Sequence, residues 1–138
     1  MNQFGESQMS FKNVTADTSY TISLKHRNSI EIWSNINIIF KYSRSVMSFI
    51  LSSLVSVYGD NEMQVDTSPI RYAMYSGDVN QDGFIDLNDV ISISNKANEF
   101  APGYLVQDLT GNNLVDLNDV LMAYNNSVNF VSRKTPLD

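Results

Sequence analysis

The order of apolar and polar residues changes character about halfway along the chain. In the first half, Tyr20, Ile22 and Leu24 alternate with polar residues, which is the period of two that is typical of a half-buried strand. This pattern predicts a β-rich segment over residues 1–69. Further apolar runs lie at residues 30–33 and 36–40. Residues 25–28 are a polar connection between the first strand and the run at 30–33.

In the second half, apolar residues recur with the period of a helix, once from Leu87 and again from Leu117. Each helical pattern follows a stretch that is rich in Asp and Asn. No convincing amphipathic helix precedes either stretch, and residues 71–77 have an extended, turn-like composition. We therefore predict a small all-α module of two loop-helix units over residues 70–138, which gives the whole chain an α+β fold class.

The two polar stretches share one template of oxygen donors, thirty residues apart. A calcium ion takes about six to eight oxygen ligands. A 12-residue loop supplies them from positions 1, 3, 5, 7, 9 and 12, with a backbone carbonyl at position 7 and often a water at position 9. In the first loop, residues 78–89, these positions hold Asp78, Asn80, Asp82, Phe84, Asp86 and Asp89. In the second loop, residues 108–119, they hold Asp108, Thr110, Asn112, Leu114, Asp116 and Asp119. The spacing predicts one calcium ion in each loop.

The two loops are not equivalent as ligands. Position 6 must turn the chain sharply, and it is Gly83 in the first loop but Asn113 in the second. Asn tolerates the left-handed region at a higher cost than Gly. The first loop also has four carboxylates at the ligand positions, whereas the second has three. Because charge count and rigidity tune affinity, we expect the first loop to bind calcium more tightly.

A single cluster of Asp, Asn and Gly is more often an Asx-turn or a helix N-cap than an ion site. Two copies with the same spacing, each followed by a helical pattern, favour ion sites here. Position 8 holds Ile85 and Val115. We predict that both are buried and that they pair with each other in a short two-stranded contact between the loops.

The first repeat closely follows one known pattern, since it reads Gly77-Asp78-Val79-Asn80-Gln81-Asp82-Gly83-Phe84-Ile85. Position 12 of each loop is Asp rather than Glu, and a helix follows each loop but does not precede it. In these features residues 76–132 resemble the type I dockerin domain. The resemblance implies two loop-helix units of EF-hand type that pack antiparallel and hold one calcium ion each. It also implies docking to a cohesin domain, often in polysaccharide breakdown, and no enzymatic activity.

In dockerins, positions 10 and 11 of each loop often carry partner recognition. The resemblance places this role on Leu87, Asn88, Leu117 and Asn118. Family members commonly have a Ser-Thr-type pair there and basic residues further along the helix. This sequence has neither, which leaves the identity of the partner open, including whether it is a cohesin.

The first half contains a series of short motifs, in the order Tyr20-Thr21-Ile22, Lys25-His26-Arg27-Asn28, Trp33-Ser34 and Tyr58-Gly59-Asp60-Asn61. This order is similar to the end of a β-sandwich domain found near the C-termini of secreted bacterial surface proteins. The similarity implies that residues 1–69 are the tail of a larger β-sandwich and that the protein is secreted or lies at the cell surface.

The alternative function is a structural or carbohydrate-binding surface tail that calcium makes rigid, without a cohesin partner. Trp33, Phe40 and Tyr42 are candidates for a sugar-stacking platform, although aromatic residues at strand spacing are more typical of a core. His26 is a lone histidine between Lys25 and Arg27. No spacing assembles a catalytic constellation around it, so we expect a structural hydrogen-bonding role.

Charge supports cation binding. The chain has a net charge of −6, and residues 78–119 hold eight acidic residues against Lys96 alone, a net of −7 that leaves +1 for the rest. Such a distribution argues against nucleic-acid binding, which needs a basic surface. The absence of cysteine excludes a disulfide framework and thiol-based metal sites.

Nothing in the sequence predicts insertion into a membrane. The longest uncharged run, residues 45–59, is shorter than the roughly 20 apolar residues of a spanning helix. We interpret this run as a buried segment of a soluble domain. Residues 1–7 lack the basic and apolar regions of a signal peptide.

Overall fold

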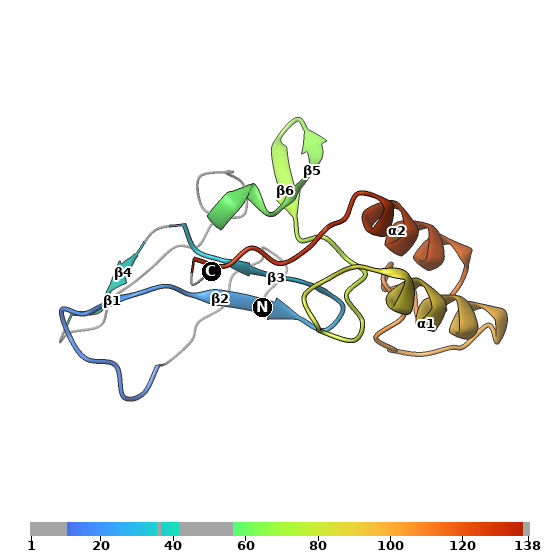
Figure 1. Ribbon diagram of the computed structural model, residues 1–138, viewed down its shortest axis with the longest axis horizontal. Helices are drawn as coiled ribbons and strands as arrows, with labels where there is room; N and C mark the ends of the chain where they lie inside the picture. Colours follow the sequence, from blue (N-terminus) through green and yellow to red (C-terminus); the bar gives the residue numbers. More distant parts are fainter. Residues whose placement is uncertain (1–10, 36, 42–56, 137–138) are drawn as a thin grey trace.

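The computed structural model describes residues 11–35, 37–41 and 57–136 (Figure 1). Its elements are short strands in the first half and two helices in the second, so the α+β fold class expected from the sequence is confirmed. In chain order they are β1 (Ser19–Tyr20), β2 (Ser23–His26), β3 (Ser29–Trp33), β4 (Ile38–Ile39), the 3-10 turn η2 (Tyr58–Asp60), β5 (Met63–Thr67), β6 (Ile70–Ala73), α1 (Leu87–Asn98) and α2 (Leu117–Val128).

The described strands form three separate two-stranded antiparallel sheets, which pair β1 with β4, β2 with β3, and β5 with β6. The alternating segment around Ile22 is divided between β1 and β2. Strand β3 is buried over its first four residues. The reason is that β2 covers one edge of β3, while on another side the N–H of Ile30 donates to the carbonyl of Tyr75 at 2.9 Å.

Of the run expected at residues 36–40, the described residues 37–40 contain the strand β4 at Ile38–Ile39. Next to it, the ring of Phe40 packs against the rings of Phe11 and Tyr20, at centroid distances of 5.6 and 5.7 Å. Phe40 is therefore part of a packed aromatic cluster. Several sequence expectations fall outside the described residues, namely Tyr42, residues 1–7 and most of the run 45–59.

The two helices pack against each other in antiparallel directions (Figure 1). The N–H of Val115, before α2, donates to the carbonyl of Ala101, after α1, at 2.9 Å. Reciprocally, the N–H of Ile85 donates to the carbonyl of Val131 at 3.0 Å. Apolar side chains spaced three or four residues apart on each helix fill the interface, as the helical period predicts. The buried core consists of Ile93, Ala101, Val115 and Ala123, with Val79, Val90, Ala97, Leu105, Leu109 and Val120 around it.

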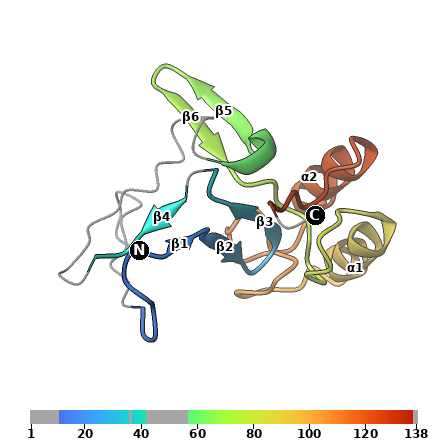
Figure 2. The ribbon, with the colours of Figure 1, turned by 60° about the vertical axis from the view of Figure 1, so that its left-hand side comes forward.

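The two halves of the chain are joined by contacts as well as by the backbone. The hairpin β5–β6 spans residues 63–73, so it includes the position where the sequence suggested a division, and it projects away from the rest of the protein in both views (Figures 1 and 2). Ser29, at the start of β3, forms a bridge with Ser76, directly before the first loop. The end of the β2–β3 hairpin therefore lies against the helical module.

Glu62, between η2 and β5, is a buried acid without a cation. Its side chain is 4% exposed, and neither carboxyl oxygen has a hydrogen-bond partner in the described part of the chain. Burial, with a smaller contribution from the charge of Asp60, raises the pKa of Glu62 from 4.5 to about 7. Because the folded state binds this proton more tightly than the unfolded state, its contribution to stability is complete below pH 4.5. That contribution is lost as the pH rises through about 7.

We expect Glu62→Gln to remove this part of the pH dependence. Relative to the unsubstituted chain, the variant should gain about 3 kcal/mol in free energy of unfolding between a pH below 4.5 and a pH about one unit above 7. Urea denaturation at the two pH values measures the change. Glu99→Gln is a matched control, because Glu99 is exposed and only pairs with Lys96. An equal pH dependence in Glu62→Gln and the unsubstituted chain contradicts the prediction.

Candidate functional site

The start of each helix is fixed by the loop before it. The side chain of Asp86 accepts a hydrogen bond from the N–H of Asn88 at 2.7 Å, and Asp89 accepts one from the N–H of Asp86 at 3.0 Å. The side chain of Asp86 also accepts from the N–H of Asp89, so Asp86 and Asp89 form a reciprocal capping box that satisfies amides left free at the helix N-terminus. Asp116 and Asp119 form the same box at the start of α2, so positions 9 and 12 have a structural role in both loops.

The acidic residues at position 1 are buried and accept backbone hydrogen bonds from the turn. Asp78 accepts from the N–H groups of Asp82 and Gly83 at 3.1 and 3.2 Å. Asp108 accepts from those of Asn112 and Asn113 at 3.2 and 3.0 Å. Asp78 is 2% exposed and Asp108 is fully buried. Each loop therefore wraps around the carboxylate with which it begins.

The carboxylates at position 12 close the loops. Asp89 accepts from the N–H groups of Val79 and Asn80 at 3.0 and 3.3 Å, and it is fully buried. Asp119, equally buried, accepts from the equivalent pair, Leu109 and Thr110, at 2.9 Å each. The duplication seen in the sequence thus extends to the hydrogen bonds of the two loops.

The turn at position 6 has the backbone that the sequence predicted. Gly83 adopts φ +93° and Asn113 adopts φ +67°. Position 4 is also left-handed in both loops, with φ values of 60° at Gln81 and 73° at Gly111. Sequence reasoning missed this second turn, for which Gly111 was the signal. Gln81 tolerates the turn with its side chain folded back, so that its amide donates to the carbonyl of Asp78 at 2.7 Å.

The remaining ligand candidates lie nearer the surface. Asn80 and Asp82 are exposed and hydrogen-bonded to each other at 2.8 Å, and Thr110 and Asn112 are exposed in the second loop. Position 7 follows the same path in each, because the N–H groups of Phe84 and Leu114 donate to the side chains at position 5. Within the described residues, Asp, Glu and His side chains do not gather in groups of three or more that hold a metal ion as they stand.

In the first loop, burial and repulsion between neighbouring acids disfavour the ionised form of the carboxyl groups. Burial is the main reason that the pKa of Asp78 is raised, and repulsion from Asp89 and Asp82 adds to it. Burial likewise raises the pKa of Asp89. The ion pairs of the described residues join Lys25 and Arg133 to Glu31, Lys41 to Asp17, and Lys96 to Glu99, and so leave the loop carboxylates aside. Buried charges in proteins are usually paired or coordinate metals. Within the described residues, the carboxylates of the two loops have no ion-pair partner.

Protein-family models, curated proteins and solved structures were compared with the chain. None of them matches. In the described part of the chain, no helix is both long and apolar enough to cross a membrane.

The predicted pairing of Ile85 with Val115 is wrong. Both residues are buried as expected, at 2% and 0% exposed, but their N–H groups donate to Val131 and Ala101 respectively. Each position-8 residue thus pairs with the segment that follows the opposite helix. The antiparallel helices cause this, because they place the start of one unit beside the end of the other.

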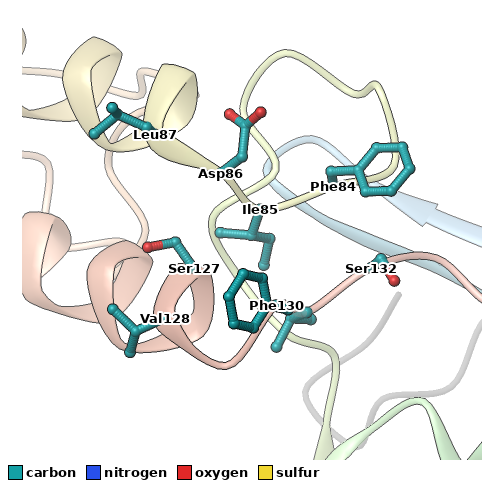
Figure 3. Close-up of a pocket in the computed structure, with 9 residues that line it drawn as sticks. Phe84, Ile85, Asp86, Leu87, Ser127, Val128, Phe130 and Ser132 are labelled. Carbon is teal, nitrogen blue, oxygen red and sulfur yellow. The ribbon is translucent and has the colours of Figure 1, made fainter.

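The four residues expected to contact a partner lie on the surface. Leu87 and Leu117 are 68% and 67% exposed, so neither packs between the helices. Asn88 and Asn118 are exposed as well, and the caps are made by Asp86 and Asp116 instead. A groove of about 570 Å³ adjoins Leu87 where the start of α1 meets the end of α2 (Figure 3). Its other lining residues are Phe84, Ile85, Asp86, Ser127, Val128, Phe130, Val131 and Ser132.

His26 forms the hydrogen bonds that its sequence context suggested. Its Nδ1 lies 2.9 Å from Oδ1 of Asn28 and 3.3 Å from the hydroxyl of Ser29, all within the β2–β3 hairpin. Sequence reasoning missed the two residues beside it. Arg27 and Asn28 both contact the second loop.

Proposed function

We propose that residues 76–132 are a dockerin-like module that binds one calcium ion in each loop and docks to a protein partner of the cohesin type. One observation carries the proposal, namely that both loops repeat the same hydrogen-bond pattern around buried carboxylates at positions 1 and 12. Buried acids in duplicate, with no cationic side chain paired to them in the described residues, fit a bound cation.

The donor set favours calcium. Carboxylate, amide and carbonyl oxygens suit a hard cation, and the loops offer neither sulfur nor imidazole. Asp78 and Asp89 use their oxygens for amide hydrogen bonds, but an ionised carboxylate has about four lone-pair sites and keeps capacity for an ion. Bound calcium supplies the positive charge that the loops lack. The residues that would hold it are Asp78, Asn80, Asp82, Phe84, Asp86 and Asp89, and in the second loop Asp108, Thr110, Asn112, Leu114, Asp116 and Asp119.

The exposed pairs Leu87-Asn88 and Leu117-Asn118 support a protein partner. An apolar side chain beside an amide provides an anchor and a directed hydrogen bond, which together can form a small hot spot. In this proposal the chain is a binding module rather than an enzyme, and it attaches a secreted or cell-surface protein to its partner, in polysaccharide breakdown. Residues 1–69 are then the end of a β-sandwich-like domain.

Pull-down of the full chain with a panel of cohesin domains, in calcium and in EDTA, tests the proposal. We expect capture by at least one cohesin in calcium and its loss in EDTA. An Asp78→Ala/Asp108→Ala variant serves as a control, because it should behave in calcium as the unsubstituted chain does in EDTA. Calcium-dependent stability without capture by any cohesin would instead favour the structural or carbohydrate-binding surface tail.

The two calcium sites should differ in affinity. The first loop has more carboxylates and a glycine at position 6, so we expect Asp78→Ala to remove the tighter site and Asp108→Ala the weaker one. Because each variant keeps one of the two sites, isothermal titration calorimetry of that variant measures the calcium affinity of the loop that remains. If the loop left in Asp78→Ala binds calcium more tightly than the loop left in Asp108→Ala, carboxylate number does not set the order.

A further inference from the structure

The turn between β2 and β3 reaches across to the second loop. His26 pairs with Ser29, which leaves Arg27 and Asn28 as a two-residue connection at the tip of the hairpin. The guanidinium of Arg27 donates to the carbonyls of Leu105 and Asp108, the latter at 3.0 Å. It also lies over the ring of Tyr104, 3.8 Å from the centroid. These contacts hold the side chain of Arg27 against the segment that leads into the second loop.

Asn28 contacts the entries of both loops. Its side chain is 1% exposed, and its Nδ2 donates to the carbonyl of Asp108 at 3.1 Å. Its own carbonyl accepts from the N–H of Gly77, directly before the first loop, at 2.7 Å. Because His26 bonds to Oδ1 of Asn28, the amide is oriented with its donor toward Asp108. The carbonyl of Asp108 therefore receives two side-chain donors from the β-rich half.

In the first loop, the carbonyl of the position-1 residue accepts a hydrogen bond from a side chain of the loop itself. Gln81, at position 4, donates to the carbonyl of Asp78 at 2.7 Å. In the second loop position 4 is Gly111, which has no side chain to make this bond. Arg27 and Asn28 thus take the place of the missing glutamine, and they do so in the loop with fewer carboxylates.

We propose that Arg27 and Asn28 are positioning residues of the second calcium loop. By fixing the peptide plane of Asp108, they hold the position-1 carboxylate in the geometry that binds the ion. Less conformational entropy is therefore lost when calcium binds. The inference rests on calcium binding by the loops. Coupling between sites is reciprocal, so calcium in the second loop should in turn strengthen the docking of the β2–β3 turn.

The test compares calcium affinity between loops in the full chain. In the Asp78→Ala background only the second loop remains, and adding Arg27→Lys or Asn28→Ala should weaken its affinity about tenfold, as expected for loss of a charge-assisted or buried hydrogen bond. Lys preserves the positive charge but lacks the rigid planar fork of N–H donors with which Arg27 reaches the two carbonyls. In the Asp108→Ala background the same changes should leave the first loop unaltered, since the bond from Gly77 goes to the backbone of Asn28.

A rescue variant separates positioning from general damage. A Cβ added at Gly111 meets no atom within 4 Å, and Gln81 adopts nearly the same φ in the first loop. Gly111→Gln therefore gives the second loop its own donor to Asp108. It should restore most of the affinity that Arg27→Lys removes. Lys25→Ala is the matched control, because Lys25 is an exposed cation of β2 that pairs with Glu31.

Hydrogen exchange provides a second readout. By reciprocity, calcium should slow exchange over residues 29–33 in the unsubstituted chain but much less in Asn28→Ala. Unchanged affinity of the second loop in Arg27→Lys and Asn28→Ala, or equal weakening of both loops, overturns the positioning role alone. Absence of calcium binding by the unsubstituted chain overturns the proposed function and the positioning role with it.

Discussion

Removal of calcium by EDTA should unfold the two helices of residues 76–132. Without the ion, the carboxylates of the first loop are left close together, and Asp78 and Asp89 are buried. The core that must resist this repulsion is small, since the buried apolar side chains of the described residues 76–132 are Ile85, Ile93, Ala101, Val115 and Ala123. Ligand binding at about a thousand times the dissociation constant stabilises the folded state by about 4 kcal/mol per site, which is a large fraction of the stability of such a module.

Far-ultraviolet circular dichroism and thermal melting of the full chain in calcium and in EDTA measure this effect. We expect loss of most helical signal in EDTA at room temperature and its return when calcium is added in excess. Magnesium at the same concentration should restore much less, because it requires a smaller, more regular shell of ligands. Identical helicity and melting temperature in calcium and EDTA would exclude the calcium sites.

The parts of the site that sequence reasoning located are those fixed by local spacing. Ligand positions within a 12-residue loop depend on the path of that loop alone, which is why Gly83 and Asn113 turn as expected. The capping boxes at Asp86 and Asp116 follow from the same local logic, since they join residues three positions apart. Calcium binding by these residues stays a prediction, which titration and removal of calcium test.

The parts that were missed depend on how distant segments pack. Ile85 and Val115 are buried as expected, but their hydrogen-bond partners are set by the antiparallel helices rather than by the spacing. Arg27 lies 81 residues before Asp108, and an arginine in a polar turn carries no periodic signal of its partner. The one local clue was the contrast between Gln81 and Gly111, which shows its meaning only once the carbonyl of Asp108 is located.

The burial of strand β3 also depends on segments that are distant in the sequence. The first four residues of β3 are buried, so side chains on both faces of this strand are covered by other segments. Glu31 in that strand is 7% exposed and is paired with Lys25 at 3.3 Å and with Arg133 at 3.5 Å. Arg133 follows α2, so the burial of this acid depends on the last segment of the described chain. No pattern within β3 itself contains that information.

Partner binding should survive the loss of either recognition pair and collapse when both are lost. Leu87-Asn88 and Leu117-Asn118 are identical in sequence and nearly equal in exposure, and each pair occupies positions 10 and 11 of its loop, in the first turn of a helix. Two pseudo-symmetric units therefore present the same anchor in two orientations. A partner pocket that accepts one leucine can accept the other after the module is turned around.

The measurement is the affinity for a cohesin that captures the unsubstituted chain in calcium. We expect near-native affinity for Leu87→Ala/Asn88→Ala and for Leu117→Ala/Asn118→Ala, and a loss of about a hundredfold or more when all four changes are combined, as for removal of a central hot spot. Each variant must first bind calcium normally, so that a damaged loop is not mistaken for a lost contact. Ile91→Ala is a control for exposed apolar surface on α1 outside the recognition pairs. Collapse with one double variant alone would assign recognition to a single face. The groove lined by Leu87 and Phe130 favours the face at the start of α1 in that case (Figure 3).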